Sequence, residues 1–274
     1  MSLRETRHRV IQKIFWSPLG ARIVHKLIRY ERMFDTVVRG YSLITATNGE
    51  RWLSTLMDDE PLVVDVGFHD GESTAEIFKV RPKAHVIGFD PSRFGRESYD
   101  RRFSGDPRVT FVNAALADKP GEMDFYDYEN MCNSLAARKE MPGETPTVYK
   151  VPILTFDDYV RTNGVGQINL MKIDAEGYDL NVMEGARETF AREGVDMFMF
   201  EFASGWAASK RYLWEVVEYM EPLPYTMFRL FNGFLCPLVY DIRNDSSCTL
   251  QTMYVGISNT RLARGDIPLR DYTF

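Results

Sequence analysis

The stretch LVVDVGFHDG (residues 62–71) decides the fold of this 274-residue chain. It begins with an apolar run, typical of a strand that is buried on both faces. It then turns through Gly67 and Gly71 before a helical pattern starts near Glu72. A strand that leads through a glycine turn into a helix is the ligand-binding element of doubly wound α/β folds. The sequence therefore predicts a parallel sheet that includes this strand.

Further apolar runs of strand length alternate with amphipathic segments along the chain. We expect strands over 85–89, 109–112, 168–173 and 197–200, and a helix over 213–220. Residues 223–257 contain strand-like runs without a strong helical pattern, which indicates an antiparallel edge. The predicted fold class is therefore α/β, a Rossmann-like doubly wound sheet that is mostly parallel with an antiparallel edge.

Two regions interrupt this rhythm. Residues 1–58 are predicted to form an N-terminal helical extension, because apolar residues recur at helical spacing over 8–32, and residues 59–274 form the main domain. Within that domain, residues 117–155 read as an insertion between the third and fourth parallel strands, with a hairpin-like start and a loop rich in proline and glycine. The insertion lies on the ligand side of an open sheet, so we expect it to shape a substrate site.

The charge of the chain is unevenly distributed. The net charge is −6, but residues 1–32 hold eight Lys or Arg against two Glu, so the remaining 242 residues carry −12. An acidic body is a poor nucleic-acid binder, because neutralisation of phosphates supplies most of that affinity. We expect the basic N-terminal helices to form a lid with its basic face in solvent. The second interpretation is contact with an anionic membrane or glycolipid.

The cysteine count excludes several kinds of site. Three cysteines without a CxxC pair do not make a disulfide framework, a zinc knuckle or an iron–sulfur site, and they fit a reducing compartment. We expect no metal ligands. Neither a signal peptide nor a membrane span is apparent, so we expect a cytoplasmic protein. The oligomeric state is not predicted.

Asp65 gives the first indication of the ligand. The turn has the spacing DxGxxxG, and it lacks the GxGxxG pattern with which dehydrogenases bind a dinucleotide pyrophosphate. An acidic side chain just before the turn repels a pyrophosphate but suits a ligand that carries an ammonium group. S-adenosylmethionine is such a ligand, since it has an amino group, a sulfonium and no phosphate.

Asp90 gives the second indication. It ends the second strand, 25 residues after Asp65, close to the offset at which an acidic residue binds a ribose diol. The alternative is structural, because Asp90, Pro91 and Ser92 also have the pattern of a helix start.

Lys172 and Asp174 give the third indication. On the two-residue period of a strand they face the same side of the sheet. A charged pair at the end of a buried strand is either a structural ion pair or part of a reactive site beside the ligand crevice.

These segments together resemble a known family. The motifs DVGFHDGEST, GFDPS, VNAALAD, ILTFDDYV and LMKIDAEGYDLNVMEGA, spread over about residues 60–205, are similar to those of FkbM-family S-adenosylmethionine-dependent methyltransferases. The resemblance implies a class I methyltransferase fold and O-methylation of hydroxyls on sugars and natural products. Phe68 and His69 depart from the family pattern, which often has small or amide residues there.

The resemblance also implies a set of site residues. Asp65, Gly67, Gly71 and Thr74 would surround the methionine portion of the cofactor, Asp90 the ribose, and Asn113 with Ala114 the adenine, while Phe68, His69, Pro91 and Ser92 complete the cofactor-binding set. Lys172, Asp174 and Glu176 would line the methyl-transfer side, with Glu176 on the substrate and Glu201 nearby.

The predicted function is O-methylation of a saccharide or glycan hydroxyl. A neutral alcohol is a poor nucleophile, so its proton must be removed. Asp174 is our first choice for that role, with Lys172 stabilising the developing alkoxide and Glu201 as a reserve base. The alternatives are a polyketide-type natural-product acceptor or a binding module without chemistry.

Overall fold

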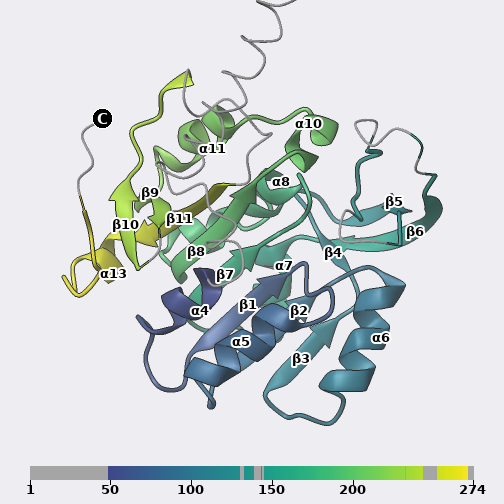
Figure 1. The fold of residues 1–274 in the computed structure, drawn as a ribbon, viewed down its shortest axis with the longest axis horizontal. Coiled ribbons are helices and arrows are strands. Elements are labelled where there is room, and N and C mark those ends of the chain that lie inside the picture. Colours follow the sequence, from purple (N-terminus) through teal and green to yellow (C-terminus); the bar gives the residue numbers. More distant parts are fainter. Residues whose placement is uncertain are drawn as a thin grey trace, which may run out of the picture. The chain divides into compact units, whose positions relative to one another are not determined.

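The computed structural model describes residues 49–129, 133–138, 143, 145–231, 233–242 and 252–270. Its main sheet has the strand order β3-β2-β1-β7-β8-β11-β9-β10 (Figure 1). The strands are β1 (Leu62–Val66), β2 (His85–Phe89), β3 (Val109–Val112), β7 (Ile168–Ile173), β8 (Val195–Phe202), β9 (Tyr225–Phe231), β10 (Phe234–Pro237) and β11 (Thr252–Ser258). The strands expected from apolar runs between residues 62 and 200 are all present.

The strand directions confirm a mostly parallel sheet with an antiparallel edge. Strands β3, β2, β1, β7 and β8 pair in parallel. Strand β11 is antiparallel to both β8 and β9, so β9 runs in the same direction as the parallel strands beyond it. The antiparallel strand β11 thus lies inside the edge region, and β10 pairs antiparallel with β9 at the outer edge. The chain reaches β9 before it returns to fill the gap with β11.

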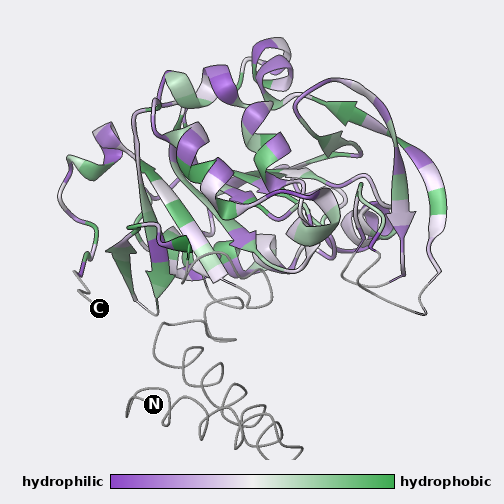
Figure 2. Ribbon diagram, turned by 90° about the horizontal axis from the view of Figure 1, so that it is seen from above, coloured by the Kyte–Doolittle hydropathy of each residue, from purple (hydrophilic) through white to green (hydrophobic). Residues whose placement is uncertain are grey.

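Helices cover both faces of the sheet, as a doubly wound fold requires. On one face β1 and β7 pack with α4 (Gly49–Ser54) and α5 (Glu72–Val80), which Figure 1 shows in front of the sheet. The other face packs against α7 (Phe156–Asn163), α8 (Asp179–Glu184), α9 (Arg187–Ala191), α10 (Gly205–Ser209) and α11 (Leu213–Met220). Figure 2 shows hydrophilic and hydrophobic residues alternating along the helices, as expected when one side of each faces the sheet. Val63 and Val64, on opposite faces of β1, are both fully buried.

The predicted insertion contains a separate small sheet. Strand β5 (Gly121–Asp127) forms an antiparallel pair with β6 (Thr147–Leu154), and β6 pairs in parallel with β4 (Ala115–Leu116). This sheet has its own apolar cluster, which includes Phe125 and Val151. The antiparallel pair starts at Gly121, where the hairpin-like pattern begins in the sequence.

The remaining elements are local. Helix α6 (Arg93–Arg102) follows β2, and α13 (Asn259–Leu262) follows β11. The helices expected over residues 8–32 lie outside the described residues. Helix α4 falls within the predicted N-terminal extension and places Leu53 in the core of the main domain, while the boundary at residue 58 stays a prediction. Among the described residues, none of the helices has the length and apolar character needed to cross a membrane.

Candidate active site

The carboxyl ends of β1 and β7 bring three charged side chains together. Asp65 and Lys172 are partners in the register of these strands. Lys172 Nζ lies 3.5 Å from Oδ1 of Asp65 and 3.2 Å from Oδ2 of Asp174. Lys172 and Asp174 therefore face the same side, as the strand period predicts.

The surroundings of Lys172 keep its amino group charged. Burial lowers the pKa of Lys172, but the carboxylates of Asp174 and Asp65 outweigh burial and raise that pKa above its usual value. Lys172 is thus a cation at neutral pH. It can stabilise negative charge, but it cannot act as a base there.

Asp65 is fully buried at the centre of this cluster. Its Oδ2 accepts a hydrogen bond of 2.9 Å from Oγ1 of Thr74, which lies in the first turn of α5. Its Oδ1 accepts no hydrogen bond from the described residues and has only Lys172 at ion-pair distance. Burial raises the pKa of Asp65, and Lys172 partly offsets that effect.

Gly67 fits against the turn that follows β7. Its φ is +80°, and a Cβ added there would lie 2.0 Å from the backbone oxygen of Asp174. The amide of Asp174 also donates to the carbonyl of Val66 at 3.0 Å. Glycine is thus required at residue 67 by the close approach of two turns, in addition to any contact with a ligand.

Phe68 and Gly71 serve the packing of the turn. The Phe68 ring is 2% exposed and makes edge-to-face contacts with Phe103 and Phe111. A Cβ on Gly71 would lie 2.5 Å from Phe103 and 2.8 Å from Phe68. The Phe68 ring therefore points into the core and away from the site. Only the backbone of Phe68 lies on the turn predicted to bind the cofactor.

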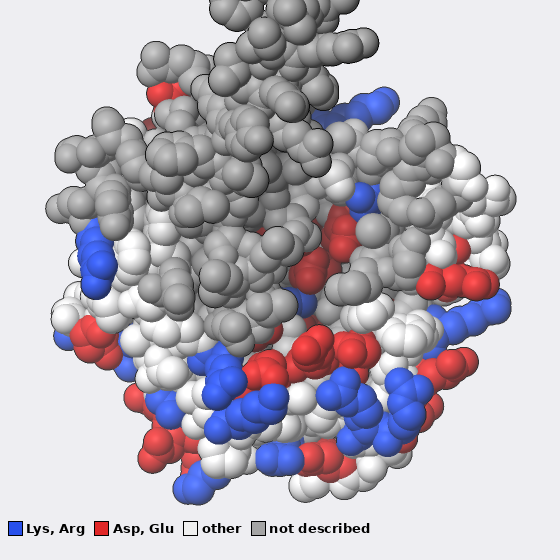
Figure 3. Space-filling view, in the orientation of Figure 1, with Lys and Arg blue, Asp and Glu red and all other residues white. Residues whose placement is uncertain are grey.

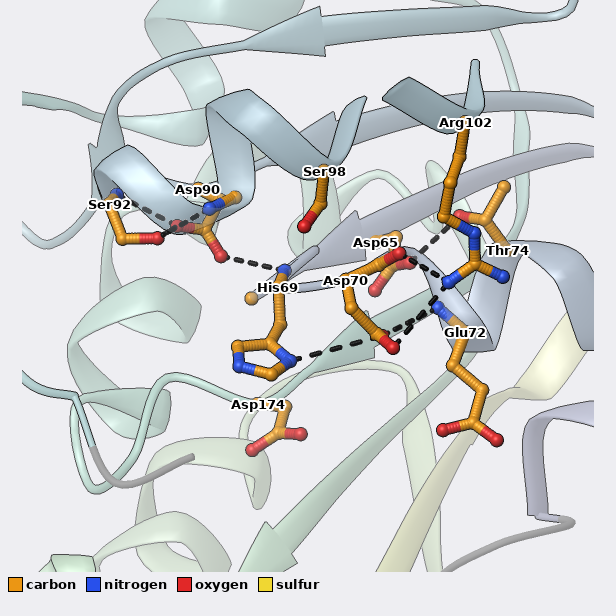
Figure 4. A network of polar contacts seen from close by, with 12 residues as sticks. Asp65, His69, Asp70, Glu72, Thr74, Asp90, Ser92, Ser98, Arg102 and Asp174 are labelled. Atoms are coloured by element: carbon orange, nitrogen blue, oxygen red, sulfur yellow. Dashed lines mark hydrogen bonds and ion pairs between the residues drawn. The ribbon is translucent and has the colours of Figure 1, made fainter. Parts of the chain in front are cut away.

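Asp90 organises the end of β2 (Figure 4). Its Oδ2 accepts from the His69 amide at 2.7 Å, and its Oδ1 accepts from both the amide and the hydroxyl of Ser92. Ser92 in turn caps α6 by accepting from the Gly95 amide. A carboxylate has about four lone-pair positions, so one remains for a ribose hydroxyl.

The predicted adenine-side residues lie next to Asp90. Asn113 is exposed and its Nδ2 donates to the backbone oxygen of Asp90 at 2.7 Å, whereas Ala114 is buried.

Pro91 is half-buried between Asp90 and the start of α6. The His69 ring lies 4.6 Å from the ring of Phe94.

The turn after β7 is held in an unusual conformation. Glu176 has a φ of +50°, in the left-handed region, and Gly177 follows at +97°. A Cβ on Gly177 would lie 2.3 Å from the backbone oxygen of Gly205 at the start of α10. Asp179 accepts from the amides of Gly177 and Ala175 and so braces the turn from inside.

Burial and neighbouring carboxylates raise the pKa values of Glu176 and Glu201. Burial, followed by the charge of Asp174, raises the pKa of Glu176 to about 7. Burial, followed by Asp174 and Glu176, raises the pKa of Glu201 to about 8. The backbone oxygen of Glu201 accepts from the Trp206 indole at 2.8 Å, which anchors that strand end.

Three further residues of the site gave no signal in the sequence. Glu50, on α4, is 5% exposed and contributes to the charge around Lys172; burial raises its pKa. Arg138, in the insertion, pairs with Glu176 at 2.9 Å. Asp179 belongs to the KIDAEGYD motif and accepts hydrogen bonds from two backbone amides. In the sequence it cannot be distinguished from an ordinary acidic residue at the start of a helix.

The charges fit S-adenosylmethionine. Five carboxylates, those of Glu50, Asp65, Asp174, Glu176 and Glu201, interact around Lys172 and Arg138. Figure 3 shows Asp and Glu side chains gathered near the middle of the face in view. The buried Oδ1 of Asp65, without a hydrogen bond, lies in this acidic surrounding. Such a site attracts the ammonium and sulfonium charges of this cofactor and repels a pyrophosphate.

Comparisons with known proteins find similarity to methyltransferases. The 2-O-methyltransferase NoeI of Sinorhizobium fredii (strain NBRC 101917 / NGR234) is 23% identical over 153 residues, which cover 51% of this chain and 63% of NoeI, less than two thirds of that relative. A crystal structure of the methyltransferase FkbM from Methylobacillus flagellatus KT has a TM-score of 0.48 and 17% identity, covering 74% of this chain and 47% of that one. The plantazolicin methyltransferase BpumL in complex with SAH has a TM-score of 0.42 and 12% identity over 90% of this chain and 93% of that one.

A match to a family model identifies the family of this chain. The methyltransferase FkbM domain matches residues 65–236, from the buried aspartate of β1 to β10. The match includes the turn after β1, the end of β2 and the turn after β7. Because it spans more than half of the chain, this protein belongs to the FkbM family of methyltransferases.

Proposed function

We propose that this methyltransferase O-methylates a hydroxyl group of a saccharide or glycan. The observation that carries the proposal is the pair formed by Lys172 and Asp174, with nitrogen and oxygen 3.2 Å apart at the carboxyl end of β7. A half-exposed carboxylate beside a buried cation suits a hydroxyl that must lose a proton. NoeI, a 2-O-methyltransferase, supports the choice of oxygen as the acceptor atom.

S-adenosylmethionine supplies a methyl group that is already activated by its sulfonium. Asp65 would face the amino end of this cofactor, with Gly67, His69, Gly71 and Thr74 forming the turn. Asp90 with its neighbours Pro91 and Ser92 would hold the ribose, and Asn113 and Ala114 would meet the adenine. The protein must then align the acceptor and remove its proton.

Asp174 would orient the acceptor hydroxyl and accept its proton while the methyl–sulfur bond of S-adenosylmethionine breaks and the O–CH₃ bond forms. Its side chain is 36% exposed, so a substrate can reach it, whereas Lys172 is 9% exposed. Lys172 stays protonated and stabilises the negative charge that develops on the acceptor oxygen. Glu201 is the second candidate base, because a carboxylate with a pKa of about 8 is more basic than an ordinary one.

The experiment is a transfer assay with S-adenosylmethionine that is isotopically labelled in the methyl group. Neutral saccharides, saccharide fractions of cell extracts and polyketide-type alcohols are offered separately. We expect label in a saccharide as an ether that resists mild alkali. Label found only in an alkali-labile ester, or only in the polyketide-type alcohols, would overturn the proposal. The Asp174→Asn variant is the matched control, since its background labelling reports transfer that does not use the site.

A further inference from the structure

Arg138 ties the insertion to the active site. Its side chain is 2% exposed, although it belongs to the segment 133–138 that follows the β5 strand. Its Nη1 donates to Oε2 of Glu176 at 2.9 Å, and its Nη2 donates to Oγ of Ser204 at 3.1 Å. One guanidinium therefore joins the insertion to the turn after β7 and to the segment that leads from β8 into α10.

The backbone around Arg138 is fixed as well. Ser134 exchanges backbone hydrogen bonds with Tyr126 of β5, and its hydroxyl donates to the backbone oxygen of Glu176 at 3.0 Å. The amide of Arg138 donates to the Tyr128 hydroxyl at 2.7 Å. The insertion thus contacts both the backbone and the carboxylate of Glu176.

Glu176 needs such support. A left-handed conformation is unfavourable for a residue with a side chain, and surrounding contacts must stabilise it. The carboxylate is also close to like charges: Asp174 from its own turn raises its pKa, while Lys172 from β7 and Arg138 from the insertion lower it. Glu201 from β8 interacts with the same group, and Asp179 of α8 braces the turn from below. Among these contacts, the only ion pair at hydrogen-bond distance is with Arg138.

We propose that Arg138 is a positioning residue that holds the Glu176 carboxylate, and with it the turn that carries Asp174, in the geometry needed by the acceptor. This inference rests on the proposed function, because it assigns Glu176 and Asp174 to the acceptor side. It makes acceptor alignment depend on the insertion, which lies outside the strands that form the cofactor crevice. The turn after β1, where S-adenosylmethionine would bind, is not among the segments that Arg138 joins, so loss of this arginine should leave cofactor binding unchanged.

The first test compares Arg138→Met and Arg138→Lys with the wild-type enzyme and with Arg161→Met. Arg161 is an exposed residue of α7 that pairs with Asp158, so its loss serves as a control for removing one arginine. We expect Arg138→Met to lower kcat/KM for the acceptor by roughly 10- to 100-fold, as misplacement of a reacting group does. Calorimetry with S-adenosylmethionine is expected to show nearly unchanged affinity, and Arg138→Lys to restore part of the activity.

A second test reads Glu176 directly and needs no acceptor. The carboxyl groups of wild-type protein and of Arg138→Met are titrated by carbon NMR, with Glu176→Gln used to assign the signal of Glu176. Loss of the neighbouring cation raises the pKa of Glu176, so its signal is expected to titrate at higher pH in Arg138→Met. If Arg138→Met does not fold, Ser204→Ala and Arg138→Lys are titrated instead, and a smaller shift in the same direction is expected.

The outcomes separate the two proposals. If the Glu176 signal shifts but no hydroxyl acceptor is methylated, the proposed function is overturned. The contact between Arg138 and Glu176 is still supported in that case. An unshifted signal in a folded Arg138 variant overturns the inference, whatever the acceptor. A variant that loses thermal stability but keeps the wild-type kcat/KM also overturns it, because Arg138 is then only a structural residue.

Discussion

The amino nitrogen of Lys172 lies 3.2 Å from Oδ2 of Asp174, two residues further along at the end of β7. The two side chains differ in exposure, with the lysine buried and the aspartate partly exposed. The buried partner orients the open one, and the open one is available to a substrate. This division of roles leads to separate expectations for the two residues.

Replacement of Asp174 by Asn is expected to reduce turnover by about 10²- to 10⁴-fold, the usual contribution of general acid–base catalysis. Affinity for S-adenosylmethionine is expected to change little, since the contact matters mainly in the transition state. Steady-state kinetics and calorimetry on the same preparation measure both quantities. Near-normal turnover in a folded variant would move the role of base to Glu201, and Glu201→Gln in the same assay shows whether it does.

Replacement of Lys172 by Met is expected to destabilise the fold by roughly 3–5 kcal/mol. The change leaves the fully buried Asp65 without its cation. Thermal unfolding measures the effect. Lys150→Met is the control, because Lys150 forms an exposed pair with Asp124 on the small sheet and should change stability by no more than about 1 kcal/mol. The double variant Lys172→Met/Asp65→Asn should recover part of the loss, and equal loss in single and double variants speaks against the explanation.

Replacement of Asp90 by Asn is expected to weaken S-adenosylmethionine binding by roughly 1.5–3 kcal/mol, the range for a hydrogen bond to a charged group. Ser92→Ala is the control, because it removes the cap of α6 and one hydrogen bond to Asp90 but leaves the carboxylate in place. Calorimetry should therefore show a larger loss for Asp90→Asn than for Ser92→Ala. If both variants bind the cofactor as the wild type does and only their melting temperatures fall, Asp90 is a turn residue alone.

Stability without cofactor should depend on pH through Glu201. Its pKa is raised from 4.5 to about 8 in the fold, chiefly by burial. A carboxyl group with a raised pKa contributes stability that is complete below about 4.5 and is lost as the pH rises through about 8. Glu201→Gln imitates the protonated form, so its Tm should exceed that of the wild type at pH 9 and approach it at pH 6.

In a domain of this size, about 1 kcal/mol corresponds to a Tm difference of about 2–4 °C, which scanning calorimetry resolves. The exposed Glu221 provides the control variant Glu221→Gln, for which the Tm difference from wild type should not grow with pH. A Glu201→Gln variant that is less stable than the wild type at every pH would contradict the assignment.

The local parts of this fold were predictable from the sequence. The apolar runs that become β1, β2, β3, β7 and β8 can be recognised from their strand length and from the turn residues that follow them. The two-residue period of a strand places Lys172 and Asp174 on one side, and the structure confirms that placement. The roles assigned to these residues stay predictions.

Contacts between distant segments were not predictable in this way. Strand β11 lies between β8 and β9. This position depends on pairing between segments far apart in the sequence, and no local pattern predicts it. Arg138 reaches Glu176 across 38 positions, and a single arginine in a loop looks like any exposed one. The Phe68 ring turns inward because Gly88 leaves space, where a Cβ would lie 2.4 Å from it.

Because Gly67 fits against the carbonyl of Asp174, the turn proposed to bind the cofactor and the turn proposed to face the acceptor cannot move independently. A larger side chain at residue 67 would displace the backbone that carries Asp174, the proposed base. A redesign of the proposed acceptor site should therefore change the surrounding loops and keep the backbone at residues 67 and 174 together. The variable part of such a design is the rim of the site, and its fixed part is a contact between two main chains.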